Sequence, residues 1–220
     1  ITDSKEMSRI YFEKFKKKST VIAYGSTMNK SYYSLILDEC KLNIKEYYLI
    51  VGRLIPDNNS KLIAEGFLKS NSKKKLVIVG DVPYKDNYAT SVKKIACERV
   101  IFTGYIDNQN DLSCLYNNCF GYIHGHEFGG TNPTMINALN LNCQILALNT
   151  VFNNEMLNNK KAIYFEKNIK SISNAIKLFE DNYDTLLKEN FKYNISKKYD
   201  WEFISDKYLK IFKELKTKIN

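Results

Sequence analysis

The stretch YYLIVGRLIPDNNSKLIAEGFLKSNSKKKLVIVG, residues 47–80, sets the expected fold. It opens with an apolar run that ends at Gly52, continues through an amphipathic segment over 59–68, and closes with a second apolar run that ends at Gly80. Short apolar runs on either side of a helix-length segment are typical of parallel strands that are buried on both faces. The stretch therefore predicts one strand–helix–strand unit.

The same alternation continues along the chain. Further apolar runs lie at 100–104, 120–125, 144–149 and 162–165, and segments with helical spacing lie at 88–97, 111–119 and 133–141. This pattern predicts an α/β fold, a Rossmann-like doubly wound parallel sheet with C-terminal helices.

The two ends of the chain depart from this alternation. Residues 4–17 place apolar side chains at helical spacing, 19–26 predict a brief strand, and 26–45 are polar and poorly periodic. Beyond residue 169, two apolar stripes predict two closing helices, or a helix and a tail. We therefore divide the chain into an N-terminal segment (1–25), a linker (26–45), a Rossmann-like domain (46–168) and closing helices (169–220).

The composition indicates a folded chain with a real core. Of the 220 residues, 44% are hydrophobic, and only 9 Gly and 3 Pro are present, which argues against disorder and repeats. The net charge is +9, but the lysines are scattered and arginines are few, so we expect no nucleic-acid partner. No uninterrupted apolar run is long enough to predict a membrane span.

The five cysteines form no close pair with metal-ligand spacing, so we expect no bound metal. Their odd number fits a reducing compartment, and we interpret them as core or surface residues. We expect a cytoplasmic location. Peripheral contact of the lysines with the inner face of a membrane is left open.

Glycines and polar residues follow the ends of four predicted strands. They are Gly52-Arg53, Gly80-Asp81, Gly104-Tyr105 and the loop 125–134. In an open parallel sheet, ligands bind beyond the carboxyl ends of the strands, where helix N-termini offer free N–H groups. A glycine at such a place is more often a steric turn residue, and we keep that interpretation for Gly25 and Gly80.

Arg53 is unusual in a chain whose cations are almost all lysines. The planar fork of arginine suits bidentate recognition of a phosphate or carboxylate. The alternative is a structural ion pair with Asp57 or Asp81. The sequence favours neither interpretation.

The loop HGHEFGGTNP, residues 124–133, combines several signals. Its Gly-Gly pair frees the backbone for positive φ, Thr131 or Asn132 can cap a helix, and Pro133 suits the first helical position. The resulting helix N-terminus suits an anion, whereas Glu127 can accept hydrogen bonds from sugar hydroxyls. Together these signals suggest a sugar nucleotide. A purely structural role for the two histidines stays open.

The stretch GYIHGHEFGGTNPTMINAL, residues 121–139, resembles the donor-binding loop and helix of GT-B glycosyltransferases of the family 4 type, known as glycosyl transferases group 1. It is most similar to the bacterial rhamnosyltransferase-like branch. Residues 51–67, 75–81 and 100–119 resemble the neighbouring units, so the similarity covers roughly 47–157. It implies transfer of a sugar from a nucleoside-diphosphate donor to a glycan or lipid-linked acceptor, with no cofactor.

The resemblance also implies roles for single residues. Arg53 would hold the diphosphate and Glu127 would contact donor hydroxyls, and both are expected to act in catalysis. The residues expected to bind the donor are Gly52, Arg53, Asn58, Asn59, Gly104, Tyr105, Ile106, His126, Glu127, Phe128, Gly129, Gly130, Thr131, Asn132 and Asn137.

Two positions depart from the family pattern. The second glutamate of the family falls at Asn137, a neutral residue that can still bind hydroxyls. The lysine that often follows the arginine is replaced by Asn58-Asn59, so one positive charge is missing unless Lys61 supplies it.

The chain also holds one sheet domain, where GT-B enzymes have two. We expect residues 1–25 to be the end of a missing N-terminal domain, and we expect the isolated chain to bind its donor with little or no turnover. The rival interpretation is a nonenzymatic nucleotide-sugar-binding module, in which Asn137 marks lost activity. An oxidoreductase or kinase is disfavoured because neither G-x-G-x-x-G nor G-x-x-x-x-G-K-[ST] occurs.

Overall fold

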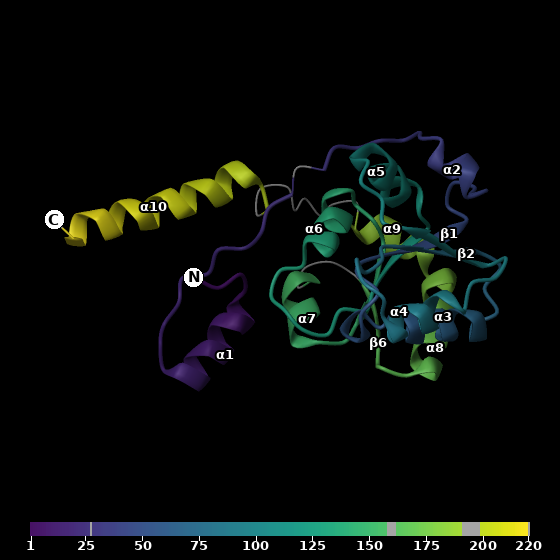
Figure 1. Cartoon of the computed structure of the whole chain (residues 1–220), viewed down its shortest axis with the longest axis horizontal. Coiled ribbons are helices and arrows are strands. Elements are labelled where there is room, and N and C mark those ends of the chain that lie inside the picture. Colours follow the sequence, from purple (N-terminus) through teal and green to yellow (C-terminus); the bar gives the residue numbers. More distant parts are fainter. Residues whose placement is uncertain (27, 158–161, 191–198, 220) are drawn as a thin grey trace.

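The computed structural model describes residues 1–26, 28–157, 162–190 and 199–219, and at its centre lies a six-stranded parallel sheet (Figure 1). The strands are β1 (Tyr47–Val51), β2 (Lys75–Val79), β3 (Val100–Gly104), β4 (Gly121–His124), β5 (Ile145–Leu148) and β6 (Ile163–Phe165). Their order is β3-β2-β1-β4-β5-β6, and every neighbouring pair is parallel. The order reverses between β1 and β4, so the predicted doubly wound sheet is confirmed.

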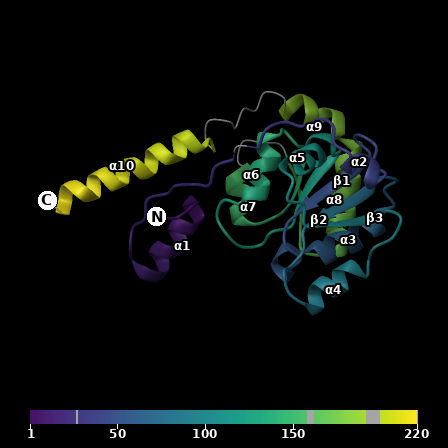
Figure 2. The ribbon, with the colours of Figure 1, turned by 45° about the horizontal axis from the view of Figure 1, so that its top comes forward.

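Helices cover both faces of this sheet (Figure 2). One face packs against α2 (Ile36–Glu39), α5 (Gln109–Asn118), α6 (Pro133–Asn140) and α7 (Val151–Leu157). The other packs against α3 (Ser60–Lys69), α4 (Asn87–Lys93), α8 (Ile169–Asp181) and α9 (Tyr183–Asn190).

The strands are apolar on both faces because both faces are covered. In β1, Leu49 packs on the α5–α6 side, whereas Tyr48 and Ile50 pack on the α3–α8 side, and all three are buried. Alternating side chains of one strand thus enter two separate cores. This double burial is the physical reason why the run YYLIV shows no polar alternation.

The predicted strand over 19–26 is wrong. Its backbone pairs with the N-terminal segment at one isolated bridge, Thr2 with Val21, and forms no strand there. The next segment, 28–45, runs along α5 and contains the short α2. The amide of Asn118 donates to the Tyr32 carbonyl at 2.9 Å, and the N–H of Ser31 donates to the Ser113 hydroxyl at 3.1 Å.

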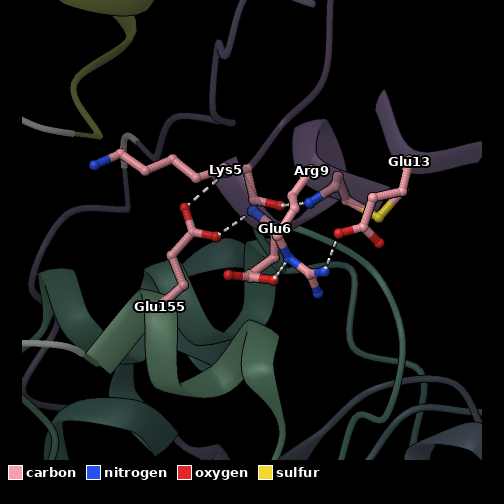
Figure 3. Close-up of polar contacts among 7 residues, drawn as sticks. Lys5, Glu6, Arg9, Glu13 and Glu155 are labelled. Carbon is pink, nitrogen blue, oxygen red and sulfur yellow. Dashed lines mark hydrogen bonds and ion pairs between the residues drawn. The ribbon is translucent and has the colours of Figure 1, made fainter. Parts of the chain in front are cut away.

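The N-terminal helix α1 (Lys5–Phe15) is joined to α7, an element that the sequence pattern does not predict (Figure 3). The side chain of Glu155 on α7 accepts hydrogen bonds from the backbone N–H groups of Lys5 and Glu6, each at 2.8 Å. A carboxylate at a helix N-terminus satisfies orphan donors and interacts favourably with the helix dipole. This contact ties the start of the chain to the sheet unit.

The last helix, α10 (Trp201–Ile219), extends away from the sheet unit beside α1 (Figures 1 and 2). The two closing stripes of the sequence thus become α8 and α9 against the sheet and α10 away from it. Within the described ranges, no helix combines the length and apolarity that crossing a bilayer requires. The short run η1 (Pro56–Asn58), a 3₁₀ turn, follows β1 and leads into the site.

Candidate functional site

A cleft of about 570 Å³ opens at the carboxyl ends of the strands, at the point where the strand order reverses. This is the place where open parallel sheets bind ligands. Of the predicted donor-binding residues, those that line the cleft are Gly52, Arg53, Asn58, Tyr105, Ile106, His126, Asn132 and Asn137. The structure therefore brings predicted residues from three separate loops and from α6 to one surface.

The remaining predicted residues lie outside the lining of the cleft. They are Asn59, Gly104, Glu127, Phe128, Gly129, Gly130 and Thr131. Sequence reasoning in turn missed lining residues on α5 and α6, namely Gln109, Leu112 and Thr134. Their signal was available, because each lies in the first turn of a helix that follows a strand.

Arg53 lies exposed at the cleft and takes part in no ion pair within the described residues. The alternative partner Asp81 is occupied elsewhere, because it pairs with Lys93 at 2.6 Å. The structural ion pair is therefore rejected. Arg53 is a charged fork without a protein partner, as an anion-binding role requires.

Asn58 and Asn59, which replace the family's lysine, fasten the β1–α3 loop to the β4–α6 loop. The amide of Asn58 donates to the Arg53 carbonyl at 2.7 Å, and its oxygen contacts Nδ1 of His126. The amide of Asn59 donates to the Gly125 carbonyl and to Glu127 Oε1, both at 2.8 Å. These two asparagines order the wall of the cleft without adding charge.

Glu127 lies outside the lining of the cleft and is paired with a cation. Its carboxylate accepts a hydrogen bond from Asn59 and forms an ion pair with Lys167, a residue just before α8. Partial burial raises the pKa of Glu127, but the bonds from Lys167 and Asn59 outweigh it and leave the pKa below its ordinary value. Glu127 is thus held as a carboxylate. Lys61, the candidate for supplying the missing positive charge, is not among the residues that line the cleft.

The N-terminus of α6 opens toward the cleft. Asn132 is the capping residue, since its Oδ1 accepts the backbone N–H of Thr134 at 2.9 Å, and Pro133 occupies the first helical position. Thr131 does not cap. Its hydroxyl instead accepts the N–H of Tyr24 and donates to the Asp3 carbonyl, which fixes the loop to the N-terminal segment.

The two glycines of the loop have different reasons for being glycine. Gly129 has φ +114°, as the sequence predicts, whereas Gly130 does not have positive φ. A Cβ on Gly130 would lie 1.8 Å from Asp3 Oδ1 and 2.6 Å from the Ser4 hydroxyl oxygen. The prediction of positive φ is therefore wrong for Gly130, whose lack of a side chain admits the start of the chain.

Gly80 confirms its interpretation as a steric residue. It has φ +128°, and a Cβ there would meet the Gly52 carbonyl oxygen at 2.0 Å. The ends of β1 and β2 can therefore approach each other only with glycine at this position.

The histidines of the loop are both held neutral. His124 is buried, and desolvation together with the neighbouring His126 lowers its pKa to about 3. Burial likewise lowers the pKa of His126. Both residues line the cleft, although the sequence left a purely structural role open for each and His124 was not among the predicted donor-binding residues.

Asn137, at the place of the family's second glutamate, also lines the cleft. Its Oδ1 accepts a hydrogen bond from the hydroxyl of Ser26 at 2.7 Å. The amide group of Asn137 is thereby oriented by a residue from the segment before the sheet. Among the described residues, no group of three His, Cys, Asp or Glu side chains could hold a metal ion.

Comparison with known proteins gives a family and a set of folds. A family model described as "Glycosyl transferases group 1" matches residues 38–198. A search of curated proteins gave no match.

Solved structures share the fold over nearly the whole chain. Sucrose-phosphate synthase from Thermosynechococcus elongatus is 14% identical with a TM-score of 0.77, over 97% of this chain and 57% of that one. Anabaena HepE in complex with UDP and glucose is 14% identical with a TM-score of 0.83, over 96% and 62%. A glycosyltransferase from Rickettsia africae is 16% identical with a TM-score of 0.76, over 96% and 62%. The chain thus spans about three fifths of their lengths.

Proposed function

The chain belongs to the glycosyl transferases group 1 family, and from this premise we propose that its cleft binds a nucleoside-diphosphate sugar for transfer to an acceptor hydroxyl. The observation that carries the proposal is Arg53, whose guanidinium forms no ion pair in the described part of the chain and lines the same cleft as the N-terminus of α6. Two sources of positive potential in one cleft suit a diphosphate and would stabilise it as a leaving group. Anabaena HepE, which shares the fold, is bound to UDP and glucose.

The sugar and acceptor are proposed from the loop sequence. The stretch HGHEFGGTNP resembles the rhamnosyltransferase-like branch, which favours a deoxyhexose donor such as a thymidine-diphosphate sugar. On the same resemblance, the acceptor is a glycan or lipid-linked carrier in polysaccharide synthesis at the cytoplasmic side of a membrane. Arg53 would hold the diphosphate. Glu127 would release its ion pair with Lys167 and accept hydrogen bonds from hydroxyls of the donor sugar.

An N-terminal domain outside this chain is proposed to complete the enzyme. The support is that the chain spans about three fifths of the structures it matches and that α1 and α10 expose large apolar side chains. These are Tyr11, Phe12, Phe15, Trp201, Phe203, Leu209, Phe212 and Leu215. Such side chains on two adjacent helices would be covered by a packed partner domain.

A second function, donor binding without catalysis, is favoured by one observation. By the family resemblance Asn137 stands where a carboxylate is expected, and its Oδ1 accepts a hydrogen bond from the Ser26 hydroxyl. If the protein is only a binding module, restoring the carboxylate with Asn137→Glu should raise turnover of the completed enzyme. In an enzyme adapted to asparagine, the same change should lower it.

The first test is calorimetric titration of the chain with uridine, thymidine and guanosine diphosphates and their sugar conjugates. Arg53→Ala should weaken binding roughly 10- to 150-fold, because a hydrogen bond to a charged group contributes about 1.5 to 3 kcal/mol. Arg9→Ala is the matched control, since the exposed Arg9 forms its ion pairs with Glu6 and Glu13 of its own helix α1. Equal affinities of the two variants would exclude Arg53 from the diphosphate site.

A further inference from the structure

The side chain of His124 has one nitrogen with a partner and one without. Its ring is buried at the end of β4 and lines the cleft. Nδ1 lies 3.1 Å from the hydroxyl of Tyr122, whereas Nε2 has no hydrogen-bond partner among the described residues. A buried polar atom without a partner costs free energy, so its presence in a cleft calls for a ligand that completes it.

A series of hydrogen bonds runs from Asn132, the cap of α6, to His124, and in each bond the donor and the acceptor can be assigned. The backbone N–H of Thr134 can only donate, so the atom of Asn132 that it meets at 2.9 Å is the amide oxygen, Oδ1. This oxygen accepts only. The Thr134 hydroxyl, 2.7 Å from it, must therefore donate its proton to Asn132.

The donor and acceptor roles of Tyr122 follow from those of Thr134. Because the Thr134 proton is used, Thr134 Oγ1 must accept from the Tyr122 hydroxyl, which lies at 2.9 Å. Tyr122 has spent its single proton in turn, so its oxygen must accept from His124. His124 is neutral, hence its one ring proton lies on Nδ1 and Nε2 carries only a lone pair.

We propose that His124 is a specificity-determining residue that accepts, through Nε2, a hydrogen bond from a hydroxyl or ring N–H group of the bound donor. The inference rests on the proposed function, because it assumes that a nucleotide sugar occupies the cleft. Phosphate oxygens are acceptors and cannot bond to a bare lone pair. His124 therefore selects the nucleoside or sugar part of the ligand, while Arg53 holds the diphosphate.

The tautomer is tested without any ligand. The chain has two histidines, so ¹⁵N–¹H long-range NMR spectra of the wild type and of His126→Phe assign His124 directly. We expect the pattern of a neutral ring protonated at Nδ1. Protonation at Nε2 in the wild type would overturn the proposal.

Thr134→Val tests the chain of bonds that sets the tautomer. Valine matches threonine in shape but leaves Tyr122 without its acceptor, so the tyrosine proton should turn to His124 Nδ1. The ring proton should then move to Nε2. Thr217→Val, on the exposed face of α10, removes a hydroxyl that donates to the Lys213 carbonyl and should leave the His124 spectrum unchanged. An unmoved proton in Thr134→Val would also sink the proposal.

Ligand analogues identify the group that His124 reads. We would titrate the wild type and His124→Phe with UDP, 2′-deoxy-UDP, 3′-deoxy-UDP, N3-methyl-UDP and UDP-glucose. His124→Phe should weaken the binding of the unmodified ligand that His124 contacts, UDP or UDP-glucose, at least about 5-fold, which is the effect of leaving a buried donor unpaired. The compound that lacks the contacted group should bind the wild type with a similarly reduced affinity. Its affinity should fall no further in His124→Phe, which shows that the missing group and His124 make the same contact. If the 2′- or 3′-deoxy compound behaves in this way, His124 contacts a ribose hydroxyl, and if the N3-methyl compound does, it contacts the base. If His124→Phe weakens the binding of UDP-glucose but not of UDP, His124 contacts the sugar.

The outcomes separate this inference from the proposed function. If the wild type binds none of these nucleotides, nor their thymidine and guanosine counterparts, both ideas fall. If it binds them but His124→Phe binds equally well, nucleotide binding stands and the role of His124 is refuted.

Discussion

At the residue scale, polar side chains at the cleft are oriented by hydrogen bonds to backbone atoms. Asn58 and Asn59 donate to backbone carbonyls of two loops, and Asn132 accepts the first free N–H of α6. Amides suit this task because each carries both donors and acceptors. The walls of the cleft are thereby ordered before any ligand arrives, which lowers the entropy that binding must overcome.

Glu127 should make stability depend on pH. Its folded pKa is lowered, so its contribution is present above the ordinary value of 4.5 and is lost as pH falls through the folded pKa. Wild type should exceed Glu127→Gln in unfolding free energy at pH 7 by no more than about 1 kcal/mol, since Lys167 is exposed. Urea unfolding from pH 7 to pH 3 should show this difference vanishing. A difference that persists at pH 3 would mean that the charge of Glu127 is not its cause.

Gly130 gives a second residue-scale prediction. Because a side chain would collide with Asp3 and Ser4, Gly130→Ala should loosen the N-terminal segment. Hydrogen exchange should show faster exchange of the α1 amides in this variant. Gly104→Ala is the comparison, because a Cβ there meets no atom within 4 Å, although its φ of +74° adds local strain. Unchanged exchange in α1 of Gly130→Ala would show that the segment can yield.

At the element scale, helix ends determine how the chain is held together. Asn132 and Pro133 begin α6 through side-chain capping and fixed φ, and both signals are local in sequence. The N-terminus of α1 is different, because Ser4 caps it locally while Glu155 reaches it from α7 (Figure 3). The second kind of cap joins elements that are far apart in the chain.

Glu155→Ala should release α1. The carboxylate accepts two backbone N–H groups, and losing such a cap costs about 0.5 to 2 kcal/mol. Limited proteolysis should then cut residues 1–18 faster than in the wild type. Glu13→Ala is the matched control, since Glu13 lies further along the same helix and pairs with the exposed Arg9 rather than with α7. Equal cutting of both variants would show that α7 does not anchor α1.

At the scale of the whole molecule, the sheet unit and the extended α10 have separate tasks. The cleft is lined by residues of the sheet unit alone, and none of its lining residues comes from α1 or α10. We therefore predict that a chain ending at residue 199 keeps the nucleotide affinity of the full chain within about twofold. Calorimetry on the two chains checks this, and a greater loss would give α10 a part in the site.

Turnover should require more than this chain. Because the acceptor site is proposed to lie in a further domain, the 220 residues alone should bind the donor and transfer little sugar, whereas fusion to the N-terminal domain should restore transfer. Release of nucleoside diphosphate in the presence of acceptor measures this. Full activity of the isolated chain would refute the two-domain proposal.

The sequence by itself determined the parallel α/β sheet, the capped start of α6 and the place of Arg53 just after the first strand. These features follow from local signals, namely apolar runs of strand length, an Asn-Pro pair and a rare arginine after a glycine. It did not predict α7, the absence of a strand over 19–26 or the close approach of the N-terminal segment to Gly130. Each of these features depends on which distant segment of the chain packs alongside. Only the tertiary structure showed that, among the residues it describes, Arg53 forms no ion pair, Glu127 pairs with Lys167, and Nε2 of His124 has no hydrogen-bond partner. Such facts about partners are set by where packing places the chain, and no local pattern records them.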